Sequence, residues 1–233
     1  MKKLHIIKAG TTYASTVQAL GDFDDWIAAA VECSGLPVAV VDVFAGAPLP
    51  SPEACCGVLV SGSHAMVTDN LPWSVAIEAW IPSLIESATP FLGICYGHQL
   101  LGRALGGQVG YNPLGREIGT VLVSLTEDGL SDMLFRGVGA TFHAHTIHEQ
   151  SVLELPQGAV ALARNPHDPV HAFRAGSCAW GVQFHPEYTV PVMKEYIAAE
   201  GEHRSGELLG QVRETPEARQ VLTNFASIAA FYC

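Results

Sequence analysis

Short runs of apolar, largely β-branched residues recur along the chain and predict buried strands. Between several of these runs, apolar residues recur with helical spacing, over residues 22–33, 73–87 and 97–105. Strands that alternate with helices are typical of a mostly parallel sheet whose two faces are covered. We therefore expect an α/β fold of three layers, with an open, twisted, mostly parallel sheet between helices. The predicted strands are residues 4–7, 38–43, 57–60, 90–94, 118–125 and 180–184.

The second half of the chain has a different pattern. Residues 111–170 carry more strand and turn signals than helical ones, which predicts a small antiparallel extension of the sheet. Helical spacing returns at residues 192–199 and 217–231, and the intervening residues 201–210 are expected to form a polar connection. No repeat or linker divides the chain, so residues 1–233 are expected to form a single domain.

Composition and charge exclude several classes of function. The chain has 12 Lys and Arg residues against 23 Asp and Glu residues, which gives a formal net charge of −11 and argues against binding to nucleic acid or to anionic membranes. No apolar stretch is long enough to span a membrane, and no signal-peptide core follows the first residues, so we expect a cytoplasmic protein. The six cysteines lack the spacing of a disulfide scaffold or a CxxC site, and reduced thiols are expected.

Residues 90–101 contain the sharpest local motif, an apolar strand that meets a helix at Gly-x-Cys-x-Gly. This is the cysteine counterpart of the strand-to-helix turn that presents a nucleophile. Gly93 and Gly97 allow a tight turn, which leaves Cys95 exposed at the start of a helix that ends at residues 106–107. The unpaired amides at this helix start favour a thiolate and can donate hydrogen bonds to an oxyanion.

Residues 180–187 can supply the base that such a nucleophile needs. Apolar and polar residues alternate up to His185, and Pro186 keeps the chain extended, so that His185 and Glu187 can project to the same side. His185 would then accept the proton of Cys95 and later protonate the leaving group, while Glu187 orients the imidazole. Each motif alone has an ordinary structural explanation, and their joint occurrence favours catalysis.

The sequence GICYGHQ at residues 93–99, followed by QFHPE at residues 183–187, resembles the class I (triad) glutamine amidotransferases. In GMP synthase, anthranilate synthase and carbamoyl-phosphate synthetase, this domain supplies ammonia. Further stretches resemble the stand-alone branch of the family, similar to the glutaminase domain of GMP synthase, at residues 21–26, 62–69, 115–119 and 150–156.

The resemblance implies roles for further residues. The family loop that usually reads Gly-Gly-Pro and contributes to the oxyanion hole corresponds here to residues 61–64, so Gly62 and Ser63 are candidate donors, with the amide of Tyr96 as the second donor. Gln99 matches the family glutamine that touches the substrate. The segment that holds the amino-acid end of the substrate corresponds to residues 147–150, which makes His148, Glu149 and Gln150 candidate substrate-binding residues that can alter selectivity.

A second group of polar residues allows a metal or an ion-pair interpretation. His143 and His145 would share a strand face, with His148 nearby, but no cysteine or carboxylate is placed beside them and the family chemistry needs neither a metal nor a cofactor. Histidines that line a cleft are the favoured interpretation. Arg116 and Glu117 are expected to form an ion-paired loop, with cleft lining as the alternative.

The leading hypothesis is hydrolysis of glutamine to glutamate and ammonia through a γ-glutamyl thioester on Cys95. Ammonia is either released or passed to a separate synthetase of the GMP-synthase type. A Gly-x-x-x-x-Gly-Lys-[Ser/Thr] nucleotide loop is absent from the sequence. The alternatives are a hydrolase of γ-glutamyl peptides or γ-glutamyl amines, and a binding or regulatory module with a residual triad. A monomer and a homodimer are both compatible with the sequence.

Overall fold

A large mixed sheet forms the centre of the protein in the computed structural model, which describes residues 1–200 and 205–233. Four neighbouring pairs, β2/β1, β1/β3, β3/β4 and β4/β11, are parallel, and the pairs from β11 to β7 are antiparallel. The spatial order is β2 (Val38–Asp42), β1 (Lys3–Lys8), β3 (Cys55–Val60), β4 (Phe91–Ile94), β11 (Ala179–Val182), β10 (Ala172–Ala175), β9 (Val160–Arg164), β6 (Glu117–Leu125) and β7 (Thr141–His148).

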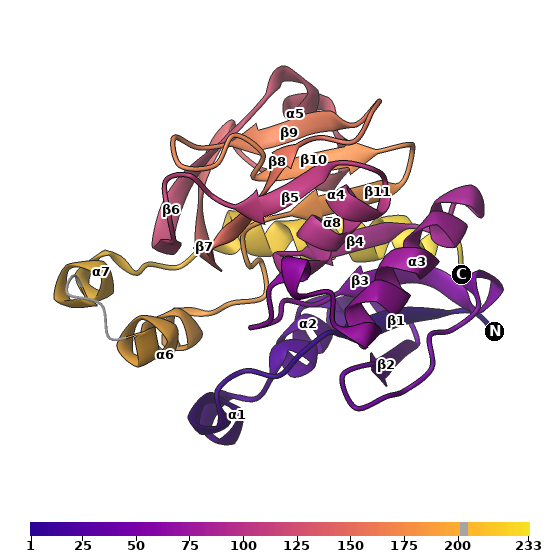
Figure 1. Cartoon of the computed structure of the whole chain (residues 1–233), viewed down its shortest axis with the longest axis horizontal. Helices are drawn as coiled ribbons and strands as arrows, with labels where there is room; N and C mark the ends of the chain where they lie inside the picture. The colour runs from indigo at the N-terminus through magenta and orange to yellow at the C-terminus, as the bar shows by residue number, and fades with distance from the viewer. Residues whose placement is uncertain (201–204) are drawn as a thin grey trace.

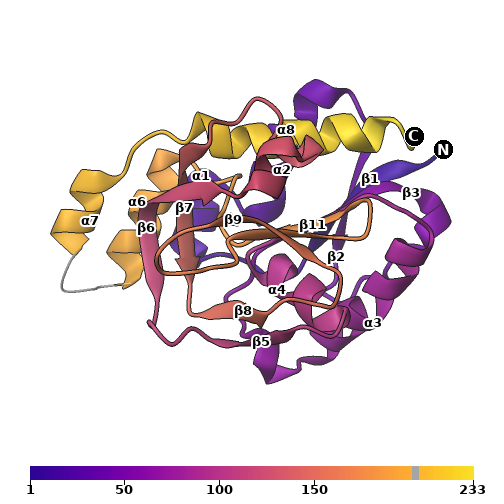
Figure 2. The same ribbon diagram turned by 90° about the horizontal axis from the view of Figure 1, so that it is seen from above.

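The division of the sheet into a parallel and an antiparallel half agrees with the sequence prediction. β3 and β4 are buried along their whole length, as expected for central strands covered on both faces. A second, antiparallel sheet of two strands, β5 (Gln108–Tyr111) and β8 (Gln150–Glu154), lies beside the large one (Figure 2). The expected α/β fold with a small antiparallel extension is therefore confirmed.

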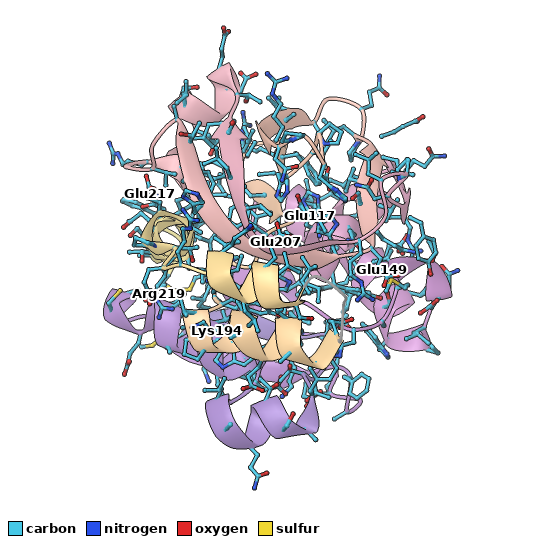
Figure 3. The ribbon with its side chains drawn as sticks, turned by 90° about the vertical axis from the view of Figure 1, so that its left-hand side faces the viewer. Glu117, Glu149, Lys194, Glu207, Glu217 and Arg219 are labelled. Carbon is cyan, nitrogen blue, oxygen red and sulfur yellow. A yellow bond between two sulfur atoms is a disulfide. The ribbon has the colours of Figure 1, made fainter. Side chains whose placement is uncertain are left out.

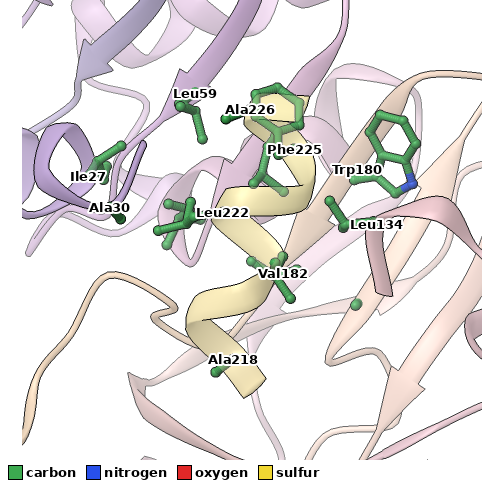
Figure 4. Packing of buried hydrophobic residues seen from close by; sticks show 14 of the residues in the cluster. Ile27, Ala30, Leu59, Leu134, Trp180, Val182, Ala218, Leu222, Phe225 and Ala226 are labelled. Carbon is green, nitrogen blue, oxygen red and sulfur yellow. The ribbon is translucent and has the colours of Figure 1, made fainter. Parts of the chain in front are cut away.

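Helices cover both faces of the sheet, which gives the three predicted layers (Figure 1). On one face, α2 (Phe23–Val31) and α8 (Pro216–Ala230) pack together, with Leu222 and Phe225 of α8 buried against the strands (Figure 4). On the other face, α3 (Pro72–Glu86) and α4 (Tyr96–Ala104) pack together over β4. The remaining helices are α1 (Ala14–Leu20), α5 (Glu127–Ser131), α6 (Val190–Glu200) and α7 (Ser205–Gln211).

Two details of the helical prediction were incomplete or wrong. Residues 205–210, expected to be a polar connection, belong to α7, and residues 201–204 of that expectation lie outside the described residues. The helix α1 was not predicted. Both helices have only seven residues, too short for a clear periodic signal, and they form because they pack against α6.

The expectation that all six cysteines are reduced was wrong for one pair. Cys56 in β3 and Cys233 after α8 form a disulfide with Cα atoms 4.8 Å apart, while Cys33, Cys55, Cys95 and Cys178 are free. The two partners are separated by 177 residues. Sequence spacing carries no information about such a pair, because only the packing of α8 over β3 brings the chain end to the strand.

No helix within the described ranges is long and apolar enough to cross a membrane.

Candidate active site

The turn between β4 and α4 holds Cys95 in a strained backbone conformation. Its φ of 48° and ψ of −94° lie in a region that residues with a side chain rarely adopt. A Cβ at Gly93 would lie 2.2 Å from the carbonyl oxygen of Gly97, and a Cβ at Gly97 would lie 2.6 Å from the carbonyl oxygen of Val60. Both glycines are therefore required by close backbone approach, as the motif predicted.

Backbone hydrogen bonds fix Cys95 on both sides. Its N–H donates to the carbonyl of Val182 in β11 (2.8 Å), and its carbonyl accepts from the N–H of Gln99 in α4 (3.1 Å). The thiol lies 3.6 Å from the carbonyl oxygen of Ile147, and the residue is only 6% exposed. Cys95 is the residue before the first turn of α4, so the free amides of that turn lie beside its sulfur.

His185 and Glu187 lie where β11 ends, next to this turn. His185 Nδ1 bonds Glu187 Oε1 at 2.8 Å, and both side chains are almost fully buried. The His185 N–H donates to the carbonyl of His145 in β7 (2.8 Å), and the ring of Tyr188 stacks on the imidazole with centroids 4.0 Å apart. Because Nδ1 is engaged by Glu187, Nε2 is the ring atom left for Cys95.

The charges of this group favour an imidazolium. Burial disfavours the protonated ring, but the negative charges of Glu187 and Cys95 and the hydrogen bonds to both outweigh it and raise the pKa of His185 to about 10. By contrast, burial lowers the pKa of the neighbouring His145 to about 4, so that ring stays neutral. His185 is therefore the histidine that can store a proton beside the sulfur at neutral pH.

The loop after β3 approaches the same imidazole. A Cβ at Gly62 would lie 2.9 Å from Cε1 of His185, so the absence of a side chain there permits the contact. Ser61 fixes the loop, because its Oγ accepts from the N–H of Ala9 (3.0 Å) and donates to the carbonyl of Gly62 (2.9 Å). In a trans peptide the carbonyl and the next N–H point in opposite directions, so the Ser63 N–H points away from Ser61.

A pocket of about 170 Å³ opens over Cys95, between the β3–α3 loop and the segment that joins β7 to β8. Its aromatic side includes Tyr13, whose loop is held where Asp22 accepts from the N–H of Thr12 (2.9 Å). The aromatic residues on this side of the pocket were not predicted, since no local motif marks them. The pocket is lined by Tyr13, Phe23, Ser63, His64, Ala65, Met66, Cys95, Tyr96, Gln99, Arg116, Ile147, His148, Glu149, Gln150, His185, Tyr188, Tyr196 and Glu200.

All four residues predicted to bind substrate line this pocket, but they do so differently. Gln99 Nε2 donates to the carbonyl of Gln150 (2.7 Å) and to Gln183 Oε1 (3.1 Å). The Gln150 side chain donates to Thr68 Oγ1 (2.7 Å). The imidazole of His148 turns to buried Glu117, whereas Glu149 pairs with Arg116 at the rim.

Arg116 and Glu117, expected to form an ion-paired loop, pair with other residues and not with each other. Arg116 bonds Glu149 and Glu200, whose carboxylate also accepts from the hydroxyl of Tyr13. Glu117 begins β6 and is buried, on the side of the molecule where α6 and α7 lie (Figure 3). Arg116 lies in the loop just before β6, whereas Glu117 is the first residue of the strand, and the two side chains meet different partners. Arg116 instead joins the rim of the pocket, the alternative considered for it.

The histidine cluster also differs from the predicted one. His143 and His145 share a face of β7, but His148 has the opposite parity and points to the other face. Its neighbours are Glu117 and His171, and one ligand atom from each lies within 4.8 Å of the others, the geometry of a possible metal site. Both histidines already bond Glu117 Oε2, at 3.1 and 2.9 Å, so hydrogen bonds alone account for the arrangement.

Comparisons with known proteins show the family of the chain. The family model for class I glutamine amidotransferases matches residues 17–201. GMP synthase from Aeropyrum pernix is 33% identical over 172 residues, which are 74% of this chain and 27% of that protein. The glutamine-hydrolysing GMP synthase subunit from Sulfurisphaera tokodaii is 31% identical over 62% of this chain and 76% of its own length. Gamma-glutamyl peptidase 5 from Arabidopsis thaliana is 30% identical over 60% of this chain and 57% of its own length.

Solved structures show the same fold. A glutamine amidotransferase from Methylobacillus flagellatus superposes with a TM-score of 0.78 at 22% identity, covering 100% of this chain and 95% of its own. This chain spans about a quarter of the full-length GMP synthases that it matches. With a family match over most of its length and the same fold, the chain belongs to the class I glutamine amidotransferases, a family of cysteine amidohydrolases.

Proposed function

We propose that the chain hydrolyses the side-chain amide of glutamine to glutamate and ammonia, with Cys95 as nucleophile. The observation that carries this proposal is the contact of Cys95, on a strained turn, with a buried His185 that is bonded to Glu187. A cysteine paired with a histidine that a carboxylate orients is the arrangement of a cysteine acyl-transfer enzyme.

The steps follow from the positions of the protons. The Cys95 thiolate attacks the amide carbon, and His185 Nε2 gives its proton to the nitrogen as the C–N bond breaks, which releases ammonia and leaves a γ-glutamyl thioester. Water then attacks the thioester and gives one proton to His185 Nε2, and the C–S bond breaks to yield the thiolate and the side-chain carboxyl group, which releases its proton to solvent to give glutamate. Glu187 holds Nδ1 throughout and stabilises the imidazolium.

The oxyanion of both tetrahedral intermediates would be held by backbone amides. We assign one donor to the N–H of Tyr96, the first residue of α4, because amides of the first helical turn have no acceptor within the helix. The second donor comes from the Gly62–Ser63 loop, and the Ser63 N–H is the better candidate because the Gly62 carbonyl is turned to Ser61.

The ammonia would pass to a separate synthetase or be released. The match to the single GMP synthase subunit of Sulfurisphaera tokodaii covers three quarters of that protein, whereas the match to full-length GMP synthases covers about a quarter of them. A stand-alone glutaminase with a synthetase partner is therefore the model that these relatives support.

A hydrolase of γ-glutamyl peptides or amines is the second candidate. It is favoured by His64, which follows Ser63 at the pocket mouth and packs on Tyr13 with ring centroids 4.5 Å apart. His185 would protonate the leaving amine on this side of the pocket, so a bulky amine would meet these rings. The similarity to Arabidopsis gamma-glutamyl peptidases 3 and 5 is the second support.

Labelling with a diazoketone analogue of glutamine tests whether Cys95 is a working nucleophile. We expect one adduct per chain on Cys95, lost in Cys95→Ser. The other free cysteines are internal controls: burial raises the pKa of Cys55 to about 11 and also raises that of Cys178, and Cys33 is exposed outside the pocket. A chain without any Cys95 adduct would support a binding module with a residual triad. The glutaminase and the γ-glutamyl hydrolase would be distinguished by kcat/KM for glutamine, γ-glutamyl dipeptides and γ-glutamylethylamide.

The pH dependence of hydrolysis should report the bond between Glu187 and His185. His185 must be protonated to release ammonia, so with a pKa of about 10 the alkaline limb of kcat/KM is expected near pH 10. Replacing Glu187 by Gln removes a charge that holds the proton, while the burial that opposes protonation remains. The alkaline limb of Glu187→Gln should move down by at least about one pH unit. A limb that stays in place would exclude this role of Glu187.

A further inference from the structure

A buried ionic cluster behind the pocket is formed by Glu117, His148 and His171. Glu117 begins β6 and pairs in register with His148 at the end of β7, while His171 precedes β10. Glu117 Oε2 accepts from Nε2 of both histidines, and Oε1 accepts from the side chain of Asn165 (2.6 Å). Burial alone would raise the pKa of Glu117, but the bonds from the two histidines hold it well below the ordinary value, so the group is a carboxylate.

Both ring nitrogens of His148 face oxygen acceptors. Nε2 faces the Glu117 carboxylate at 3.1 Å, and Nδ1 faces the carbonyl oxygen of Gln150 at 3.0 Å. Both of these partners can only accept hydrogen bonds. The hydroxyl of Ser151 is farther from Nδ1, at 3.4 Å, and a ring that accepted from it would place two acceptors against each other at Gln150. His148 is therefore held between Glu117 and the Gln150 carbonyl.

The carbonyl of Gln150 connects His148 to Gln99 in the pocket. The same oxygen accepts from Gln99 Nε2 (2.7 Å), whose second hydrogen is directed to Gln183 Oε1 (3.1 Å). Both amide hydrogens of Gln99 are thus donated, which leaves its Oε1 as the acceptor available to a ligand. Gln99 and Gln150 both line the pocket.

We propose that Glu117 and His148 are positioning residues that set the affinity of the pocket for the γ-glutamyl part of the substrate. Glu117 orients the His148 ring, His148 holds the Gln150 carbonyl, and that carbonyl orients the Gln99 carboxamide. The pair touches neither the thiol nor the leaving group, so it acts on binding and leaves the chemical step unchanged. This inference rests on the proposed function, because it concerns the ligand of the same site.

Two histidines of equal burial give a matched test. His148 and His171 both donate to Glu117 Oε2, and His148 alone also holds Gln150. We would measure the dissociation constant of glutamine by calorimetry in the Cys95→Ser chain, with His148→Ala or His171→Ala added, and kcat and KM in chains that keep Cys95. Leaving the buried Gln150 carbonyl without this hydrogen bond corresponds to about a tenfold weaker affinity or more.

The expected result is that His148→Ala weakens glutamine binding and raises KM about tenfold or more, with kcat within about threefold of the parent value. His171→Ala should lower the melting temperature but leave affinity within about threefold. His148→Asn keeps a donor near the position of Nδ1 and should recover part of the affinity, and it carries the test if His148→Ala does not fold.

Several outcomes would overturn the inference. One is unchanged glutamine affinity in folded His148→Ala and His148→Asn, and another is an equal loss of affinity in the His148 and His171 variants. The others are a fall of kcat as large as the rise in KM, and stoichiometric bound zinc whose removal weakens glutamine binding. The proposed function fails separately, if the Cys95→Ser chain binds glutamine but the wild-type chain hydrolyses no γ-glutamyl compound. Absence of glutamine binding to the Cys95→Ser chain would overturn both.

Discussion

Cys95→Ser should lower the rate of glutamine hydrolysis by at least about 10⁴-fold and leave the fold intact. Loss of the nucleophile in a triad removes nearly all of the rate enhancement, because histidine and carboxylate act through it. Serine is smaller than cysteine and can occupy the same strained turn, so stability should change little. The measurement is release of ammonia at saturating glutamine, with the melting temperature recorded on the same samples.

Cys33→Ser is the matched control for this result, since Cys33 is a free and exposed cysteine outside the pocket. Its rate should equal that of the wild-type chain. A Cys95→Ser chain that kept more than about 1% of the activity would show that another group performs the attack, and the mechanism proposed above would then be wrong.

Gly93→Ala should destabilise the protein by about 3 kcal/mol or more and abolish labelling of Cys95. The new Cβ would lie 2.2 Å from the carbonyl oxygen and 2.3 Å from the carbonyl carbon of Gly97, and 2.6 Å from the amide nitrogen of His98. These are backbone atoms of α4, so no side-chain rotation can relieve the overlap and the helix must move away from β4. Urea unfolding gives the free energy, and electrophile labelling gives the state of the turn.

Gly210→Ala is the control for the same substitution where there is room. Gly210 lies in α7, and a Cβ there meets nothing within 4 Å. Alanine favours helix over glycine, so the free energy of unfolding should stay the same or rise by up to about 1 kcal/mol. A Gly93→Ala chain as stable as this control would show that α4 can shift at no cost.

The local sequence was sufficient for the two motifs of the site. Gly93, Cys95 and Gly97 describe a turn that only small residues permit, and Pro186 sets the extended chain between His185 and Glu187. These constraints act over a few residues, which is why they are visible in the sequence. The sequence also allowed the prediction that His148 faces away from His143 and His145, because even and odd positions of a strand point to opposite faces.

The residues that form the rim and wall of the pocket could not be predicted from local sequence. Arg116, Glu149 and Glu200 come from three segments, and their contacts depend on how α6 lies against the β6–β7 pair. The aromatic side, including Tyr13, has no common spacing in the chain. Pairings of this kind depend on long-range packing, for which sequence periodicity carries no signal.

By itself, the sequence determined the alternation of strands and helices, the turn at Cys95, and the histidine and glutamate that can act on Cys95. Each of these follows from steric and hydrogen-bonding rules over short distances. Only the tertiary structure decided that Cys56 meets Cys233, that Glu117 bonds His148 and not Arg116, and that the buried carboxylate of Glu187 raises the pKa of His185. Those outcomes depend on burial and on close contacts between groups from distant segments, and both arise only when the chain folds.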